Sequence, residues 1–161
     1  NESIWFVITH LTPYLEVDRL KELDVLFTNL PGEYTGLVLM GDFNSLSPFD
    51  GYDEKLLLKK ARAANFEKFG IDYLRVDVQN KIIDQGFVDS FYYLSKKFES
   101  TVPTGFCKDH AHFVDVRLDY IFTTQNLVKN FVKSKVVKNS ETIHISDHFP
   151  ITLELDLTTE Q

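Results

Sequence analysis

The chain has 161 residues, which is enough for one compact domain and too few for two of ordinary size. Its hydrophobic content of 43%, with only 7 glycines and 5 prolines, excludes a disordered or fibrous protein. With 17 Lys and Arg against 24 Asp and Glu, the net charge is −7, so a polyanion must be held locally or through a metal. A single cysteine excludes an internal disulfide, and no apolar run approaches the roughly 20 residues of a membrane span.

The start of the chain gives no targeting signal. The only methionine is Met40, and the chain opens on Asn1 and runs at once into an apolar stretch. We therefore expect it to be the interior of a longer protein. This leaves the cellular compartment open, with an intracellular one favoured.

Apolar strands and an amphipathic helix are expected in the first part of the chain. Residues 4–8 form an unbroken apolar run, which predicts a strand covered on both faces. Residues 17–30 repeat apolar side chains every three or four positions, which predicts a helix closed by the Pro-Gly pair at 31–32. A second buried strand is predicted at 37–40, and polar residues follow it, where α/β folds tend to place their chemistry.

The later elements are less uniform. Residues 53–69 are helix-like, and periodicity does not decide whether 87–91 is a short strand or the start of a helix. Residues 100–115 contain Pro, Gly and many polar side chains, which predicts a long loop. Strand patterns are typical of three later segments, the last of them alternating as a half-buried strand does: 117–122, 132–138 and 151–157.

Six polar side chains lie at the ends of these strands or just before one. Carboxylates, an amide and imidazoles gathered on one rim are what metal-assisted attack on a phosphate needs: ligands for Mg²⁺, a base to orient water, and donors for developing charge. Strand geometry places Asp42 and Asn44 on the same side, with Phe43 on the other. The six are His10, Asp42, Asn44, Asp119, Asp147 and His148.

Taken singly, these residues also have structural interpretations. Asp42 and Asn44 can shape a turn, His10 can end a strand, and Asp147 can cap a helix. Asp119 inside an apolar strand is harder to explain, because burying a carboxylate without a partner is costly.

Four short motifs carry a resemblance. They are Thr-His-Leu at 9–11, Gly-Asp-Phe-Asn-Ser at 41–45, Arg-Leu-Asp-Tyr at 117–120 and Ser-Asp-His-Phe-Pro-Ile at 146–151. In this order they resemble the endonuclease/exonuclease/phosphatase superfamily, which includes deoxyribonuclease I, apurinic endonucleases, deadenylases and neutral sphingomyelinases. The resemblance implies an α/β (α+β) fold, a two-sheet β-sandwich flanked by helices.

Members of that superfamily carry two further motifs upstream, an Asn and a metal-binding Glu. The resemblance therefore implies that residues 1–161 are the C-terminal portion of one catalytic domain, incomplete at the N-terminus. The missing N-terminal half is then an expected partner.

The resemblance also implies a role for each catalytic candidate. Asp42 would orient and activate the attacking water, and Asn44 would hold that water or contact the phosphate. His148 would contact the scissile phosphate, with Asp119 hydrogen-bonded to it. His10 is similar to a second phosphate-facing histidine. A carboxylate beside an imidazole fixes its tautomer and favours its protonated form.

The implied cofactor is Mg²⁺ or Mn²⁺. Asp147 is similar to the superfamily's metal-ligand Asp, and Asp42 and Asn44 are further candidate ligands. The implied function is metal-dependent phosphoester hydrolysis, with nucleic acid favoured as substrate. A phospholipid or phosphomonoester phosphatase, and a non-catalytic scaffold of the same fold, are the alternatives. The motif at 117–120 resembles apurinic endonucleases while that at 41–45 resembles deadenylases and general nucleases, so the motifs leave the substrate open.

Two other clusters have competing interpretations. One has the residue types of a zinc site but no standard structural-zinc spacing, and it is equally well interpreted as an active-site rim: Cys107, Asp109, His110 and His112. The other is a run of lysines for which a solvated strand face is favoured over phosphate contact: Lys129, Lys133, Lys135 and Lys138.

Overall fold

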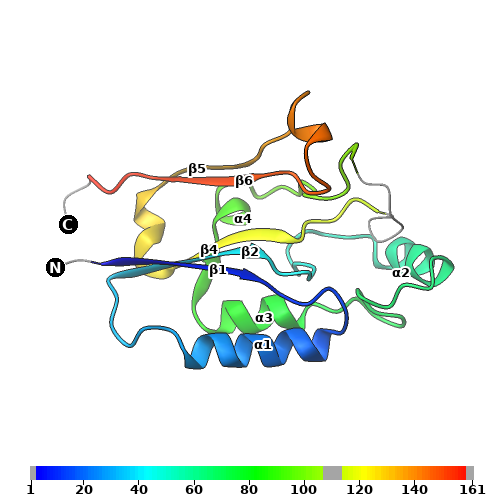
Figure 1. The fold of residues 1–161 in the computed structure, drawn as a ribbon, viewed down its shortest axis with the longest axis horizontal. Helices are drawn as coiled ribbons and strands as arrows, with labels where there is room; N and C mark the ends of the chain where they lie inside the picture. Colours follow the sequence, from blue (N-terminus) through cyan, green and yellow to red (C-terminus); the bar gives the residue numbers. More distant parts are fainter. Residues whose placement is uncertain (1–2, 107–113, 159–161) are drawn as a thin grey trace.

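The structure is a computed structural model that describes residues 3–106 and 114–158. Two β-sheets lie one above the other at its centre (Figure 1). The larger sheet has the strand order β1-β2-β4-β3, with β1 parallel to β2 and the other neighbours antiparallel. The predicted two-sheet architecture is therefore confirmed. The strands of the larger sheet are β1 (Ile4–His10), β2 (Gly36–Asp42), β3 (Phe87–Asp89) and β4 (Asp119–Thr124).

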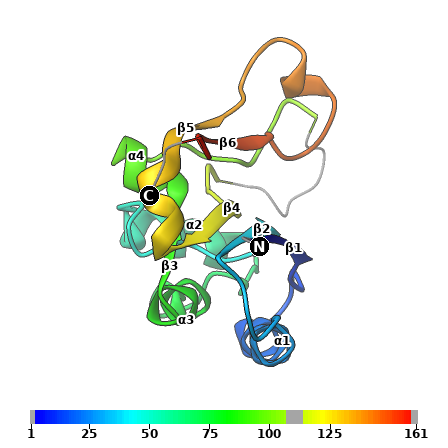
Figure 2. The same cartoon turned by 90° about the vertical axis from the view of Figure 1, so that its left-hand side faces the viewer.

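The smaller sheet pairs β5 (Phe131–Val136) with β6 (Ile151–Leu155) in antiparallel register. It covers one face of the larger sheet, and α1 and α3 cover the other, as the end-on view shows (Figure 2). The helices are α1 (Glu16–Thr28), α2 (Glu54–Ala63), α3 (Asp77–Asp84) and α4 (Ser90–Ser95), with 3₁₀ turns η1 (Gln125–Asn130) and η2 (Thr142–His144). None of the described helices has the length and apolarity needed to cross a bilayer.

Strand β2 lies at the centre of the core. Leu37 and Leu39 pack with the buried side chains of α1 and α3, while Val38 packs with those of β6. All three are at most 2% exposed, so the prediction of a strand covered on both faces is confirmed here. The alternation in β6 is confirmed too, because its apolar residues are half-buried while Thr152 and Glu154 are exposed.

The same prediction is wrong for β1. Trp5, Phe6 and Ile8 are 47%, 59% and 76% exposed. Among the described residues β1 pairs only with β2, so it forms an edge of the sheet. An unbroken apolar run predicts a buried strand only if the strand has neighbours on both of its hydrogen-bonding edges. Among the described residues, β1 has such a neighbour on one edge only.

Three other elements refine the expectations. The helix expected at 53–69 ends at Ala63, because Asn65 adopts a left-handed φ of 52° and the chain turns so that Phe69 enters the core. Residues 87–91 contain both a strand and a helix start, since the Asp89 side chain accepts hydrogen bonds from the first turn of α4. Helix α3 was not expected from the pattern.

The segment at 100–115 and the run of lysines at 129–138 were given interpretations from the sequence. In the described part of the loop at 100–115, Val102 pairs with Val116 in an isolated bridge. The four cysteine, aspartate and histidine positions between 107 and 112 lie outside the described residues. The lysines at 129, 133, 135 and 138 are all exposed, which agrees with a solvated face.

Candidate active site

A cavity of about 590 Å³ lies at one end of the larger sheet. Strands β1 and β2 are parallel and finish there, with His10 and Asp42 paired in register. Strand β4 is antiparallel and begins there, with Asp119 opposite Asp42. The sheet therefore brings three of the six predicted residues side by side. The cavity is lined by all six, together with four residues from the chain after β1 and after α2: His10, Pro13, Tyr14, Asp42, Asn44, Phe66, Lys68, Asp119, Asp147 and His148.

Asp119 and His148 form a close polar contact between two catalytic candidates. His148 Nδ1 lies 2.8 Å from Asp119 Oδ2. Because a carboxylate only accepts hydrogen bonds, the imidazole carries a proton on Nδ1. The other ring nitrogen, Nε2, lies 4.0 Å from Asp42 Oδ2. Burial lowers the pKa of His148, but the hydrogen bond and charge of Asp119, together with the charges of Asp42 and Asp147, outweigh it and the pKa is raised overall. A protonated imidazole at a cavity wall can bind an anionic oxygen.

The Asp42 carboxylate is held from two sides. Its Oδ1 accepts a hydrogen bond of 2.8 Å from the backbone N–H of Asn44, and its Oδ2 lies 3.4 Å from His10 Nε2. Burial, followed by the charge of Asp119, raises the pKa of Asp42. A carboxylate of raised pKa is a stronger base than one in water.

Gly41 allows the two parallel strands to approach at the site. Its φ is +137°, and a Cβ there would lie 1.8 Å from the Thr9 carbonyl oxygen. Any side chain at this position would push β1 and β2 apart just before His10 and Asp42. The glycine in the motif at 41–45 is therefore required by backbone geometry.

Asn44 follows in a left-handed conformation, with φ of 50°. Its Nδ2 donates to the Leu11 carbonyl over 2.7 Å, and its Oδ1 accepts from Lys68 Nζ. Phe43, which lies between Asp42 and Asn44 in the sequence, is fully buried and packs against Phe122. The opposite placement of Phe43 is therefore confirmed, and the Asn44 contact to Asp42 shows that the turn interpretation also holds.

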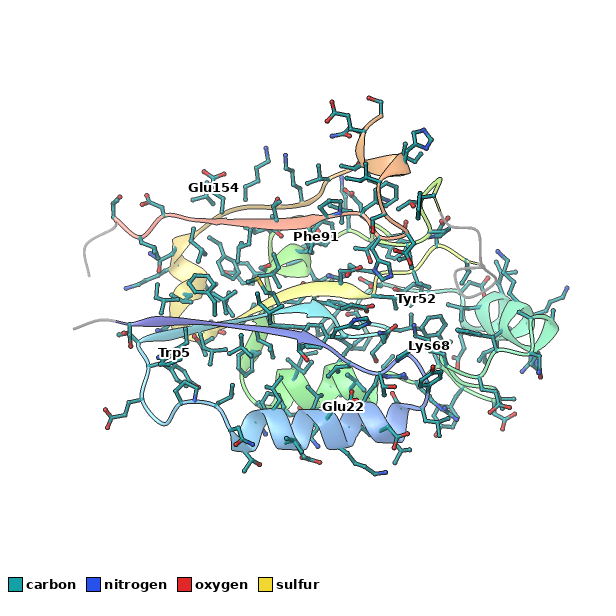
Figure 3. The ribbon with its side chains drawn as sticks, viewed as in Figure 1. Trp5, Glu22, Tyr52, Lys68, Phe91 and Glu154 are labelled. Carbon is teal, nitrogen blue, oxygen red and sulfur yellow. The ribbon has the colours of Figure 1, made fainter. Side chains whose placement is uncertain are left out.

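Lys68 is a cavity residue that the sequence patterns did not single out. It lies in the turn after α2 and is only 6% exposed (Figure 3). The signal available in the sequence is its position between Phe66 and Phe69, since a lysine flanked by aromatic residues is often partly buried. That signal is weak without the structure.

A second charged cluster lies beneath the site. The Arg117 side chain is fully buried and forms hydrogen bonds with Asp50, over 3.1 and 2.8 Å, and with Asp89, over 3.0 Å. Its backbone carbonyl accepts a hydrogen bond of 2.7 Å from the Tyr120 hydroxyl. These contacts hold the segment that leads into β4, and so they place Asp119.

Comparison with known proteins identifies the family. The family model described as Endonuclease/Exonuclease/phosphatase family matches residues 6–148. The chain belongs to this family. No curated protein matches the chain at a significant level.

Solved structures share the fold of this endonuclease/exonuclease/phosphatase chain. An AP endonuclease from Archaeoglobus fulgidus superimposes with a TM-score of 0.60 at 17% identity, over 94% of this chain and 61% of that one. A 3′ phosphatase from Neisseria, bound to a product DNA hairpin, gives 0.54 at 20% identity, over 87% of this chain and 51% of that one. The inositol polyphosphate 5-phosphatase domain of SPsynaptojanin, in complex with inositol (1,4)-bisphosphate and calcium, gives 0.59 at 17% identity, over 93% of this chain and 45% of that one.

The chain thus spans about half the length of the solved structures that it matches. At these identities the likeness shows the fold. It is consistent with the two-sheet sandwich described above, which the predicted motifs had implied.

A metal could be held in the cavity of this family member. Asp42, Asp119 and His148 each offer a ligand atom, and these atoms lie within 4.8 Å of one another. Asp147 lines the same cavity. The carboxylates suit a hard divalent cation. Three carboxylates line the cavity against one ammonium group and two imidazoles, so a net negative charge remains even when one imidazole is protonated, and a cation would balance it.

Proposed function

We propose that the protein carrying this chain is a divalent-metal-dependent phosphoester hydrolase. The observation that supports it best is the placement of Asp42 opposite the Asp119–His148 pair in one open cavity. A base and an anion-binding imidazole on the same wall are the two groups that attack of water on a phosphate requires.

Asp42 acts as the base in this proposal. Its Oδ1 is held by the Asn44 N–H, which leaves Oδ2 towards the two histidines and the cavity. Its raised pKa makes it better able to accept a proton from water than an ordinary carboxylate. The proton taken from water would pass to Oδ2, and the new P–O bond would form as the leaving-group oxygen departs.

His148 binds the phosphate in this proposal. Asp119 fixes its tautomer and raises its pKa against the effect of burial, which favours the charged form of the ring with an N–H at Nε2. Negative charge that develops on the phosphoryl oxygens is stabilised by such a preorganised donor. His10, whose side chain is 72% exposed, would make a second contact at the rim of the cavity.

The metal would be held by carboxylates on the open side of this cluster. Members of the family generally depend on a divalent metal. Asp42 and Asp147 have the oxygen donors that Mg²⁺ prefers, while Asn44 is a weaker candidate because its Oδ1 already accepts from the ammonium group of Lys68. A bound divalent cation would neutralise charge on the phosphate. Since two or three ligands are few for an octahedral ion, we expect residues 1–161 alone to bind Mg²⁺ weakly, as calorimetry can measure.

Nucleic acid is the substrate that we favour. Two of the similar structures are a 3′ phosphatase bound to a product DNA hairpin and an AP endonuclease, and the third is an inositol polyphosphate 5-phosphatase domain. A phospholipid phosphoester is therefore the competing outcome to test.

Hydrolysis assays on the protein with its natural flanking residues test the proposal. The substrates are DNA with a 3′ phosphate or an abasic site, and vesicles containing a phosphoinositide, each with Mg²⁺, with Mn²⁺ and with a chelator. We expect hydrolysis of DNA that the chelator abolishes. Turnover of the vesicles alone would make the enzyme a lipid phosphatase, and no turnover of either substrate, with Mg²⁺ bound or not, would support the scaffold alternative.

We also infer that residues outside 1–161 cover the open edge at β1. Trp5, Phe6 and Ile8 present apolar side chains on a strand whose outer flank has no partner among the described residues. Apolar edge strands of this kind drive association. Light scattering and hydrophobic-dye binding on residues 1–161 test this. A monomer that unfolds cooperatively and binds no dye would contradict it.

A further inference from the structure

Lys68 is the only lysine or arginine among the described residues that line the cavity. It comes from neither sheet: it lies in the turn that follows α2, after the left-handed Asn65. Burying a lysine is costly unless its ammonium group has partners. Lys68 lines the same cavity as three carboxylates, and its contacts indicate what the buried charge does there.

The Lys68 ammonium contacts the Asn44 side chain. Nζ donates to Asn44 Oδ1, while Asn44 Nδ2 donates to the Leu11 carbonyl. Because an ammonium group only donates and a carbonyl only accepts, the two ends of the amide cannot exchange places. The orientation of Asn44 is thus set from both ends, by Lys68 on one side and by the chain after β1 on the other.

The backbone of Lys68 is anchored by a second buried cation. Arg19 on α1 is 1% exposed, and its Nη2 donates to the Lys68 carbonyl over 3.1 Å. Its Nη1 donates to the carbonyls of Thr12 and Tyr14, over 3.3 and 3.1 Å. Arg19 therefore ties the turn after α2 to the chain after β1, two of the segments that line the cavity beyond the strand ends.

Lys68 Nζ also lies over the Phe69 ring, 5.3 Å from its centre, in a cation–π arrangement. A methionine at this position would keep the packing of the aliphatic stem and lose the charge. The contact to Asn44 is what the ammonium group contributes towards the cavity.

We propose that Lys68 is a positioning residue of this site, which fixes the Asn44 amide for the substrate and is itself fixed by Arg19. The proposal rests on the proposed hydrolysis, because it assigns Lys68 to the same cavity. Lys68 acts through Asn44, so its contribution depends on the presence of the amide.

A double-mutant cycle in the protein with its natural flanking residues tests this dependence. We expect Lys68→Met to lower kcat at least tenfold with a smaller change in KM, and to have less than a threefold effect in an Asn44→Ala background. The matched control is Lys59→Met, which removes an exposed lysine from α2 and should leave kcat unchanged. Additive effects of Lys68→Met and Asn44→Ala, or a Lys68→Met variant as active as the control, would overturn the proposal.

A measurement without hydrolysis separates this inference from the proposed function. In metal-free protein, the side-chain amide signals of Asn44 in ¹H–¹⁵N spectra should shift in Lys68→Met and stay unchanged in Lys59→Met. Shifted signals in a protein that hydrolyses nothing would support the contact and contradict the hydrolase. If Lys68→Met does not fold, Lys68→Gln against Lys59→Gln carries the same comparison, and unchanged Asn44 signals there would overturn the proposal.

Discussion

Two groups of charged side chains flank the start of β4, and they differ in how far water reaches them. In the first, here called the sealed cluster, the side chains are 0–3% exposed; in the second, the open cluster, they are 15–21% exposed. Arg117 of the first and Asp119 of the second are two residues apart. The sealed cluster is Asp50, Asp89 and Arg117, and the open cluster is Asp42, Asp119 and His148.

In the sealed cluster both carboxylates are paired with one buried guanidinium. Arg117 pairs with two carboxylates and lies over the rings of Tyr120 and Phe91, at 4.5 and 5.3 Å. Burial lowers the pKa of Arg117, but Tyr120 and the two carboxylates raise it far above its usual range, so the guanidinium stays charged. The sealed cluster has no face towards a ligand, and its contribution is to the fold.

The open cluster has the same ratio of carboxylates to cationic partner, but its groups line the cavity. Two carboxylates share one imidazole, and the cavity beside them is open to solvent. Removing one side chain of this cluster breaks a contact with His148 or a carboxylate, and removing a carboxylate also relieves the repulsion between Asp42 and Asp119. We therefore expect a small net change in stability. The comparison therefore predicts that variants of the sealed cluster lose stability and that variants of the open cluster lose activity.

The largest effect is expected for Arg117→Met. It leaves Asp50 and Asp89 buried without their partner, which typically costs about 3–5 kcal/mol in the free energy of unfolding. Urea denaturation measures the change. Lys135→Met, which removes an exposed lysine from β5, is the matched control and should change stability by less than about 0.5 kcal/mol. A loss below about 1 kcal/mol for Arg117→Met would show that the sealed cluster does not support the fold.

Asp42→Asn and His148→Ala test the open cluster. Each should lower kcat about a hundredfold or more, because a base or an anion-binding group is lost, which corresponds to about 2.7 kcal/mol. Their unfolding midpoints should stay close to the parent's. Rates within a few-fold of the parent for both variants would remove the catalytic assignment, and a large loss of stability would erase the difference between the clusters.

Gly41→Ala should affect both properties by a smaller amount. The added Cβ would meet the Thr9 carbonyl, and the φ of +137° strains any other residue, so we expect a loss of about 1–3 kcal/mol of stability. Since His10 and Asp42 follow directly, activity should fall as well. Gly51→Ala is the control, because its Cβ would meet no atom within 4 Å, although its positive φ also adds strain. Equal effects at the two glycines would show that the approach of β1 and β2 is not limiting.

The sequence predicted the open cluster better than the sealed one. Asp42 ends one apolar strand and Asp119 begins another, and such a change between apolar and polar residues is visible in any single sequence. The role of Arg117 was not visible, because Asp50 and Asp89 lie 67 and 28 positions away and only the folded chain brings them together. Lys68 was missed for the same reason.

The strands show a similar limit. The apolar runs of β1 and β2 are alike in the sequence, and both formed strands as predicted. Leu37 and Leu39 are fully buried, whereas Phe6 and Ile8 are mostly exposed. Burial depends on the neighbours on both sides of a strand, and a local pattern contains no information about neighbours that are distant in the chain.

The smallest effect is a change in the titration of His148. Asp119 raises its pKa above the ordinary value of 6.5, although burial alone would lower it. The pair therefore stabilises the fold fully below the pKa of the unfolded histidine, and this contribution is lost as the pH rises through the higher pKa of the folded state. In Asp119→Asn, the burial of His148 remains but the carboxylate is gone, so the pKa of His148 should fall below its value in the parent. The variant should therefore lose more free energy of unfolding, relative to the parent, at acidic pH than at alkaline pH. NMR titration of the metal-free protein measures the pKa, with His148→Ala to assign the ring signals. An unchanged pKa in Asp119→Asn would mean that the open cluster does not control the charge of its imidazole, and the distinction from the sealed cluster would rest on exposure alone.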